Sequence, residues 1–341
     1  MNENWPLEGN RLKLMMFDFN WAKHVHPHEH TGPTAPQDWA FVDPREYFEW
    51  HVNFGNNAVF LHAYTHTGYA FYPTKLGAVA PGPGQDLLPR VFEMTRKAKM
   101  PFWSYFCVSC DIITNQVRRD WLVPGSEGNL LGFLAPESPW TDLLCARMEE
   151  FLSEFPVDAL LMDWFCYGEL DTSYAVQPAW FVEKPFERII GRRMPEKAES
   201  ITPEESFKYK REVLAHQFYR LRDVARRVSP QTKLIFTPPY MRPADPFWVD
   251  SPMVNESDGL LAEFSKPEIM DWLLTIRKPH QCVIATPMAS GVELSAETMK
   301  ELYAKGCGLN GYFWGTPPNF MPHPSFRKHL EAVSKTFKEL P

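Results

Sequence analysis

The stretch Val157-Asp158-Ala159-Leu160-Leu161-Met162-Asp163 is a short apolar run with an aspartate near its start and another at its end, and Ser257-Asp258-Gly259-Leu260-Leu261-Ala262-Glu263 repeats this pattern. Such a run is typical of a parallel strand that is buried on both faces. Strands of one parallel sheet end at the same edge, so Asp163 and Glu263 are expected at one rim. The two runs therefore predict a buried parallel sheet that presents two carboxyl groups together.

Apolar strand candidates alternate with amphipathic helix candidates along the chain. The strands are expected at Leu12–Asp18, Ala58–His62, Phe102–Cys107, Ala159–Asp163, Leu234–Thr237, Gly259–Glu263, Cys282–Thr286 and Gly311–Trp314. The helices are expected at Pro44–Phe54, Asp86–Lys99, Ser138–Phe155, Pro203–Val228, Pro267–Arg277, Ala296–Lys305 and Pro324–Glu339, with a weak candidate inside Asp245–Ser257. This alternation predicts an α/β fold of the (β/α)8 TIM barrel class.

A doubly wound open sheet is the alternative fold. It normally carries a glycine-rich phosphate turn after the first strand, whereas this chain has Asp18-Phe19-Asn20-Trp21 at that point. No Gly/Ser-rich linker divides the sequence, so one catalytic barrel over residues 1–341 is expected. Its loop insertions lie near 20–43, 64–85, 108–137 and 166–202. All four follow strand ends on the rim where barrel enzymes place their chemistry.

The composition excludes several functional classes. The 341 residues carry a net charge of −7, which argues against a nucleic-acid partner. No apolar run reaches the roughly 18 residues of a membrane span, and Met1–Pro6 does not begin a signal peptide. The six cysteines are expected to be reduced and buried, as in a cytoplasmic protein. The oligomeric state is left open, and a homo-oligomer is compatible with the sequence.

Asp163 and Glu263 are the candidate catalytic residues. Carboxyl groups about 5 Å apart would hydrolyse a glycoside with retention of configuration, and a gap of about 6.5–9.5 Å would give inversion. The alternative is that each acid binds a loop amide or a neighbouring arginine. Asp158 and Asp258 open their strands on the opposite rim and are expected to be structural.

Rings and polar side chains near the strand ends are candidates for substrate contact, because sugar faces stack on aromatic rings and Tyr or Trp adds a polar handle. The candidates are Asp18, Trp21, His62, His66, Trp103, Tyr105, Trp164, Tyr240 and Trp314. The alternative for each ring is plain packing beneath the long loops.

An alternating run of His24, His26, His28 and His30 follows the first strand. It could bind a divalent metal, contact sugar hydroxyls, or form an exposed polar loop. Histidines are absent from the ends of the fifth and sixth strands, where a metal-dependent hydrolase on this barrel would need them. No metal and no cofactor are therefore expected.

Several stretches resemble a group of hypothetical glycosyl hydrolases that is related to α-L-fucosidases and often described as alpha-amylase-like barrels. The matching stretches are Asn56–Tyr64, Gly68–Thr74, Met100–Tyr105, Val157–Trp164 and Phe186–Pro195, within roughly residues 10–230. The resemblance implies that Asp163 is the nucleophile. The placement of Glu263 is similar to that of the acid/base in α-galactosidase-like barrels.

The residues and the resemblance together predict a retaining, exo-acting glycosidase that uses two carboxyl groups on a glycoside or oligosaccharide. A catalytically silent carbohydrate-binding barrel and, behind it, a metal-dependent hydrolase are the alternatives. The sugar, its anomer and the linkage stay open at this point.

Overall fold

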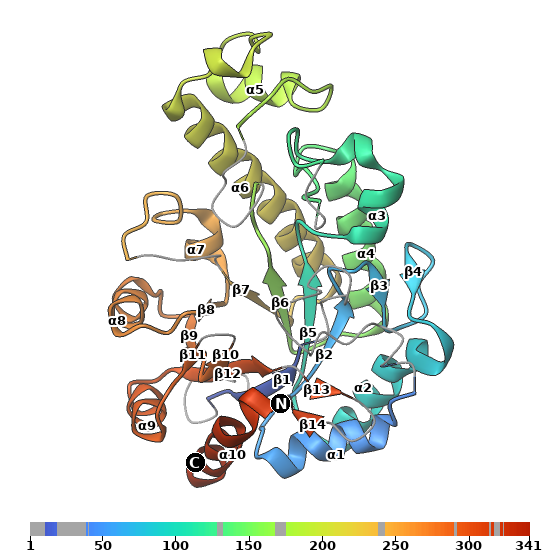
Figure 1. Cartoon of the computed structure of the whole chain (residues 1–341), viewed down its shortest axis with the longest axis vertical. Helices are drawn as coiled ribbons and strands as arrows, with labels where there is room; N and C mark the ends of the chain where they lie inside the picture. The colour runs from blue at the N-terminus through green and yellow to red at the C-terminus, as the bar shows by residue number, and fades with distance from the viewer. Residues whose placement is uncertain are drawn as a thin grey trace.

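The computed structural model describes residues 11–18, 39, 41–127, 132–167, 175–237, 243–289, 292–313, 315–316, 321–322 and 324–341. In this part of the chain, parallel strands alternate with helices and form one sheet (Figure 1). The strands are β1 (Lys13–Phe17), β2 (Val59–Tyr64), β5 (Phe102–Cys107), β6 (Ala159–Asp163), β7 (Lys233–Phe236), β8 (Gly259–Ala262), β9 (Cys282–Ala285) and β12 (Gly308–Phe313). Every predicted strand is present, with ends displaced by at most a few residues.

The order of these strands is β1-β12-β9-β8-β7-β6-β5-β2, and all the neighbouring pairs are parallel. Short strands extend the sheet beyond β2: β3 (Tyr69–Ala70) is antiparallel to it, and β4 (Ala78–Val79) pairs with β3. Two small hairpins, β10–β11 (Met288–Ala289, Val292–Glu293) and β13–β14 (Gly315–Thr316, Met321–Pro322), lie outside the sheet. The order is the one that a (β/α)8 barrel requires.

The predicted closed barrel is supported only in its strand order, because no β ladder joins β1 to β2 among the described strands. The seam is bridged instead by two consecutive asparagines. The side-chain amide of Asn56 accepts the Met15 backbone N–H at 3.0 Å and donates to the Met15 carbonyl at 3.0 Å. Asn57 accepts from the Lys13 backbone N–H at 2.8 Å and donates its own backbone N–H to the Lys13 carbonyl at 3.0 Å. Side-chain amides thus take the place of strand pairing.

The helices begin and end close to the predicted positions. They are α1 (Pro44–Phe54), α2 (Leu87–Ala98), α4 (Trp140–Glu154), α6 (Pro203–Val228), α7 (Pro252–Glu256), α8 (Pro267–Ile276), α9 (Ala296–Ala304) and α10 (Pro324–Glu339), with α3 (Ile112–Val117) and α5 (Glu183–Ile190) in loop insertions. At the start of α6, Thr202 and Glu205 form a reciprocal capping box, and Pro203 occupies the first helical position between them. None of the described helices is long and apolar enough to cross a membrane.

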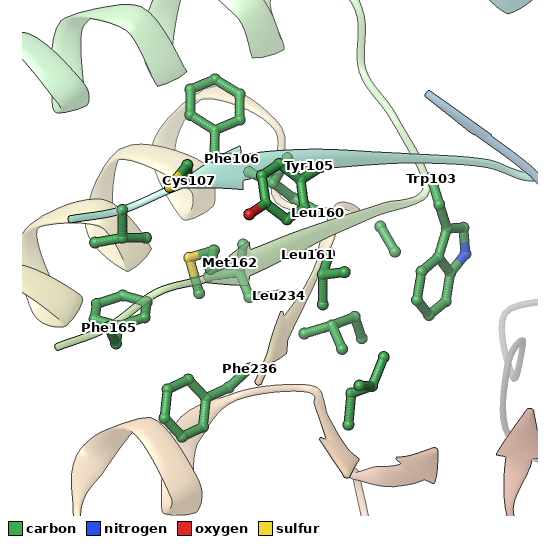
Figure 2. Packing of buried hydrophobic residues seen from close by; sticks show 14 of the residues in the cluster. Trp103, Tyr105, Phe106, Cys107, Leu160, Leu161, Met162, Phe165, Leu234 and Phe236 are labelled. Atoms are coloured by element: carbon green, nitrogen blue, oxygen red, sulfur yellow. The ribbon is translucent and has the colours of Figure 1, made fainter. Parts of the chain in front are cut away.

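The core lies between the strands and their helices, and Figure 2 shows the part around β5, β6 and β7. All residues of β2 and β5 are buried, as are the first four residues of β6. At the opposite rim from Asp163, the Asp158 carboxylate accepts the Phe102 backbone N–H at 2.8 Å, and Asp258 accepts the Leu234 N–H at 2.8 Å. Asp158 and Asp258 are structural, as predicted.

Candidate active site

The two candidate carboxyl groups lie at the points where buried strands give way to partly exposed residues. Asp163 is the last residue of β6 and Glu263 directly follows β8. Both residues are partly accessible to solvent, whereas the preceding residues of their strands are buried. Only β7 separates the two strands. The parallel sheet therefore delivers two accessible acids to one rim.

Asp163 accepts a hydrogen bond at each carboxylate oxygen. The Trp164 backbone N–H donates to Oδ1 at 2.8 Å, and the Tyr105 hydroxyl donates to Oδ2 at 3.1 Å. Burial and the charge of Glu263 raise the pKa of Asp163 to about 8, with a smaller contribution from Asp18, although the two donors act in the opposite direction. Burial and the charge of Asp163 raise the pKa of Tyr105, so its phenol keeps its proton.

Glu263 accepts one hydrogen bond, from the Tyr312 hydroxyl to Oε1 at 2.9 Å. Burial raises the pKa of Glu263, the bond from Tyr312 lowers it, and the charge of Asp18 raises it further. Asp18, the residue directly after β1, is buried and raises the pKa of Asp163 as well. Coupled carboxyl groups of this kind share protons, so one can act as a base or nucleophile while another acts as an acid.

Two predicted histidines lie beside the Asp163 partners. His62 is buried, faces Tyr105 in the β2–β5 ladder, and has its ring centroid 4.7 Å from that of Tyr105. Burial, together with the charge of His66, lowers the pKa of His62 to about 3, so His62 is neutral at pH 7. His66 stacks on Trp164 at 6.5 Å with an interplanar angle of 11°. Both histidines therefore help to form the surroundings of Asp163.

The loop that carries His66 is held by a buried ion pair. Arg147 on α4 binds Asp111 at 2.6 Å, and both side chains are almost fully buried. The backbone N–H of Ile112, the residue after Asp111, donates to the His66 carbonyl at 2.9 Å. Helix α4 thus fixes the segment after β5 and, through it, the segment after β2.

The structure brings together most of the predicted site residues that it describes, with one correction. Trp103 is fully buried near the start of β5, where it pairs in register with Phe60 and Ala159. Figure 2 shows its ring at the opposite end of β5 from Cys107. Trp103 belongs to the core rather than to the rim that carries Asp163, because it is the second residue of β5 and the start of each strand lies at the opposite rim. The predicted contacts of Trp21, Tyr240, Trp314 and the run from His24 to His30 lie outside the described residues.

Tyr312 was not among the sequence candidates. Its signal was its place in the last strand, one residue after the strand's expected start at Gly311 and two residues before Trp314. All six cysteines are free and buried, as expected. Burial raises the pKa of Cys110 and of Cys166, and Cys107 raises both further. In the described ranges, no group of three or more His, Cys, Asp or Glu side chains is placed to hold a metal ion.

Comparison with known proteins finds similarity at the level of structure. No protein-family model and no curated protein matches the chain. Alpha-L-fucosidase isoenzyme 2 from Paenibacillus thiaminolyticus superposes with a TM-score of 0.69 at 15% identity, over 96% of this chain and 49% of the fucosidase. An alpha-L-fucosidase GH29 from Bacteroides thetaiotaomicron gives 0.47 at 12% identity, over 88% and 61% of the two chains. The chain therefore shares a fold with the Paenibacillus enzyme and spans about half of its length.

Proposed function

We propose that this protein is a retaining, exo-acting glycoside hydrolase, with Asp163 as the nucleophile and Glu263 as the acid/base. The observation that carries the proposal is the placement of two partly accessible carboxyl groups at the ends of β6 and β8, with only β7 between these strands, where the charge of Glu263 raises the pKa of Asp163. Such a pair is what glycoside hydrolysis through a covalent intermediate requires. The fold shared with an α-L-fucosidase makes α-L-fucosides the first substrate class to test.

The assignment of roles follows from the hydrogen bonds. Asp163 accepts two donors, from Trp164 and Tyr105, whereas Glu263 accepts one from Tyr312. Hydrogen bonds donated to a carboxylate favour its charged form. The pKa of about 8 at Asp163 belongs to a pair of groups that share protons, and within the singly protonated pair we place the charge on Asp163, which has two donors, and the proton on Glu263. This is the distribution that the first step of the reaction needs.

In the first step, an Asp163 oxygen attacks the anomeric carbon while the bond to the leaving-group oxygen breaks. That oxygen keeps the bonding electrons and takes the proton of Glu263. In the second step, a water molecule attacks the same carbon and gives a proton to Glu263, and the bond to Asp163 breaks. Two displacements at one carbon leave its configuration unchanged.

The glycone is placed among the groups that surround Asp163. The ring of Trp164 offers a stacking surface, while His66, His62 and Asp18 supply hydrogen-bonding groups to sugar hydroxyls. His62 is neutral at pH 7, so it can donate from one ring nitrogen and accept at the other.

The test is hydrolysis of a panel of nitrophenyl glycosides, beginning with the α-L-fucoside, with NMR of the first anomer released. Retention is expected. A 2-fluoro glycosyl fluoride of the active sugar should leave a covalent adduct, which mass spectrometry of the digested protein should locate on Asp163. An inverted product, or an adduct on another residue, rejects the mechanism. Absence of hydrolysis across the whole panel rejects the activity.

A further inference from the structure

The contact between Tyr312 and Glu263 joins two strands that are not neighbours. β12 carries Tyr312, and β9 lies between β12 and β8, the strand that precedes Glu263. The phenol nevertheless lies 2.9 Å from Oε1 of Glu263. A side chain that reaches past an intervening strand to one carboxylate oxygen fixes both the position and the rotation of that carboxylate.

The bond distinguishes the two oxygens of Glu263. Oε1 is the acceptor of the Tyr312 hydroxyl. A protonated carboxyl group carries its proton on one oxygen and accepts at the other, so a donor at Oε1 places the transferable proton on Oε2. After the proton has left, the same phenol stabilises the carboxylate through a charge-assisted hydrogen bond. One contact therefore serves Glu263 in both of its protonation states.

We propose that Tyr312 is the positioning residue for the acid/base, orienting Glu263 so that Oε2 transfers the proton and adjusting how readily that proton is released. This inference rests on the proposed function and assigns a role to a residue that does not touch the reacting atoms. The charge of Asp18 disfavours the ionisation of Glu263, and the charge of Glu263 in turn disfavours the ionisation of Asp163. Tyr312 opposes the effect of Asp18 on Glu263.

Tyr105 provides a matched control, because it is also a phenol bound to a catalytic carboxylate. Its hydroxyl donates to Oδ2 of Asp163 at 3.1 Å. Replacing either tyrosine by phenylalanine removes one hydroxyl and keeps the ring. Tyr312→Phe takes a donor from the acid/base, whereas Tyr105→Phe takes one from the nucleophile. The two variants should therefore perturb opposite limbs of the pH profile.

The experiment compares the pH dependence of kcat/KM in the wild type and both variants. Tyr312→Phe should move the alkaline limb upward by about one pH unit, since a hydrogen bond to a charged group is of that size. For glycosides with poor leaving groups its kcat should fall about tenfold, and much less for a dinitrophenyl glycoside that needs no acid. Tyr105→Phe should instead move the acidic limb upward. An unmoved alkaline limb, with equal losses on both leaving groups, overturns the role of Tyr312.

A second measurement does not depend on turnover. In protein labelled with ¹³C at the glutamate carboxyl carbons, the Glu263 signal is identified by its loss in Glu263→Gln and then titrated. Tyr312→Phe should raise its midpoint, and an unchanged midpoint overturns the proposal. If glycosides are hydrolysed but neither midpoint nor limb moves, the role of Tyr312 fails and the proposed function stands. If nothing is hydrolysed but the midpoint moves, the proposed function fails, and Tyr312 still sets the protonation of Glu263.

Discussion

The backbone N–H of Trp164 donates a hydrogen bond to Oδ1 of Asp163, its neighbour in the chain, at 2.8 Å. The contact accompanies a left-handed backbone at Trp164, with φ of 60°. Residues with a Cβ atom adopt this region rarely, at a cost of about 1–2 kcal/mol, and such strain gathers at functional sites. The residue after the proposed nucleophile thus holds a strained conformation while its amide binds the carboxylate.

Replacing Trp164 by glycine should distinguish the contribution of its backbone amide from that of its ring. Glycine adopts a positive φ without strain, so the hydrogen bond to Asp163 should persist. The ring that stacks on His66 is lost, and KM should rise about tenfold with kcat little changed, since an aromatic contact contributes about that much. Trp164→Phe, which keeps a ring, is the control and should show a smaller rise. A collapse of kcat in Trp164→Gly at constant KM would contradict this division of roles.

Asp163→Asn should abolish turnover and leave the fold intact. Loss of the nucleophile is expected to lower kcat by about 10⁴-fold or more. Asp158→Asn is the matched control, since Asp158 lies at the other end of the same run. Its carboxylate accepts the Phe102 backbone N–H and forms an ion pair with Arg96. The substitution should lower the free energy of unfolding by about 1–3 kcal/mol in urea titrations and keep kcat. Near-native kcat in Asp163→Asn would exclude the nucleophile.

The rate should fall as pH rises through the upper pKa of the carboxyl pair. Burial and the charge of Glu263 raise the pKa of Asp163 to about 8, and because the two groups share protons we assign this value to the loss of the pair's last proton, which the proposed roles place on Glu263. Below that value the pair retains a proton for the leaving group, and above it both groups are ionised and no acid remains. kcat/KM should therefore decline on the alkaline side near pH 8, and Glu263→Gln should lack this limb. A rate that is flat through pH 8 in the wild type would count against a shared proton.

Glu137 should make stability depend on pH. Burial raises its pKa from 4.5 to about 7, against the effect of the Tyr209 hydroxyl that it accepts. The folded protein then binds more protons than the unfolded chain between these values, so this contribution is fully present below about pH 4.5 and is lost as pH rises to 7. Relative to Glu137→Gln, the wild type should lose about 2–3 kcal/mol of unfolding free energy across this window. If urea titrations show the same change of unfolding free energy with pH in the wild type and in Glu137→Gln, the prediction is wrong.

Asn56→Ala should weaken the seam between β1 and β2. The substitution leaves the N–H and carbonyl of Met15 without the partner that Asn56 supplies, which is expected to lower the unfolding free energy by about 2–4 kcal/mol. Amide hydrogen exchange should accelerate most at Met15, with little change at amides inside the β5–β6 ladder. Uniform acceleration throughout the sheet would instead mean that the seam opens only when the whole protein unfolds.

The strands and helices were predictable because each carries a local pattern. The apolar runs around Leu161 and Leu261 identify buried strands, and Thr202-Pro203 marks the start of α6. The bridge between β1 and β2 was not predictable, because it depends on the side chains of two asparagines that read as loop residues in the sequence. The prediction of a rim position for Trp103 was wrong, although its place directly after Phe102, the first residue of the expected strand, already assigned it to the opposite end of that strand.

The sequence alone determined that Asp163 and Glu263 end buried runs, because hydrophobic patterning is a property of neighbours in the chain. Only the tertiary structure decided what surrounds them. Tyr105 and Tyr312 come from strands about 60 and 50 residues away along the chain, and no local pattern links either tyrosine to its carboxylate. Whether a carboxyl group holds a proton depends on burial, nearby charge and donated hydrogen bonds, and these arise only when distant segments meet.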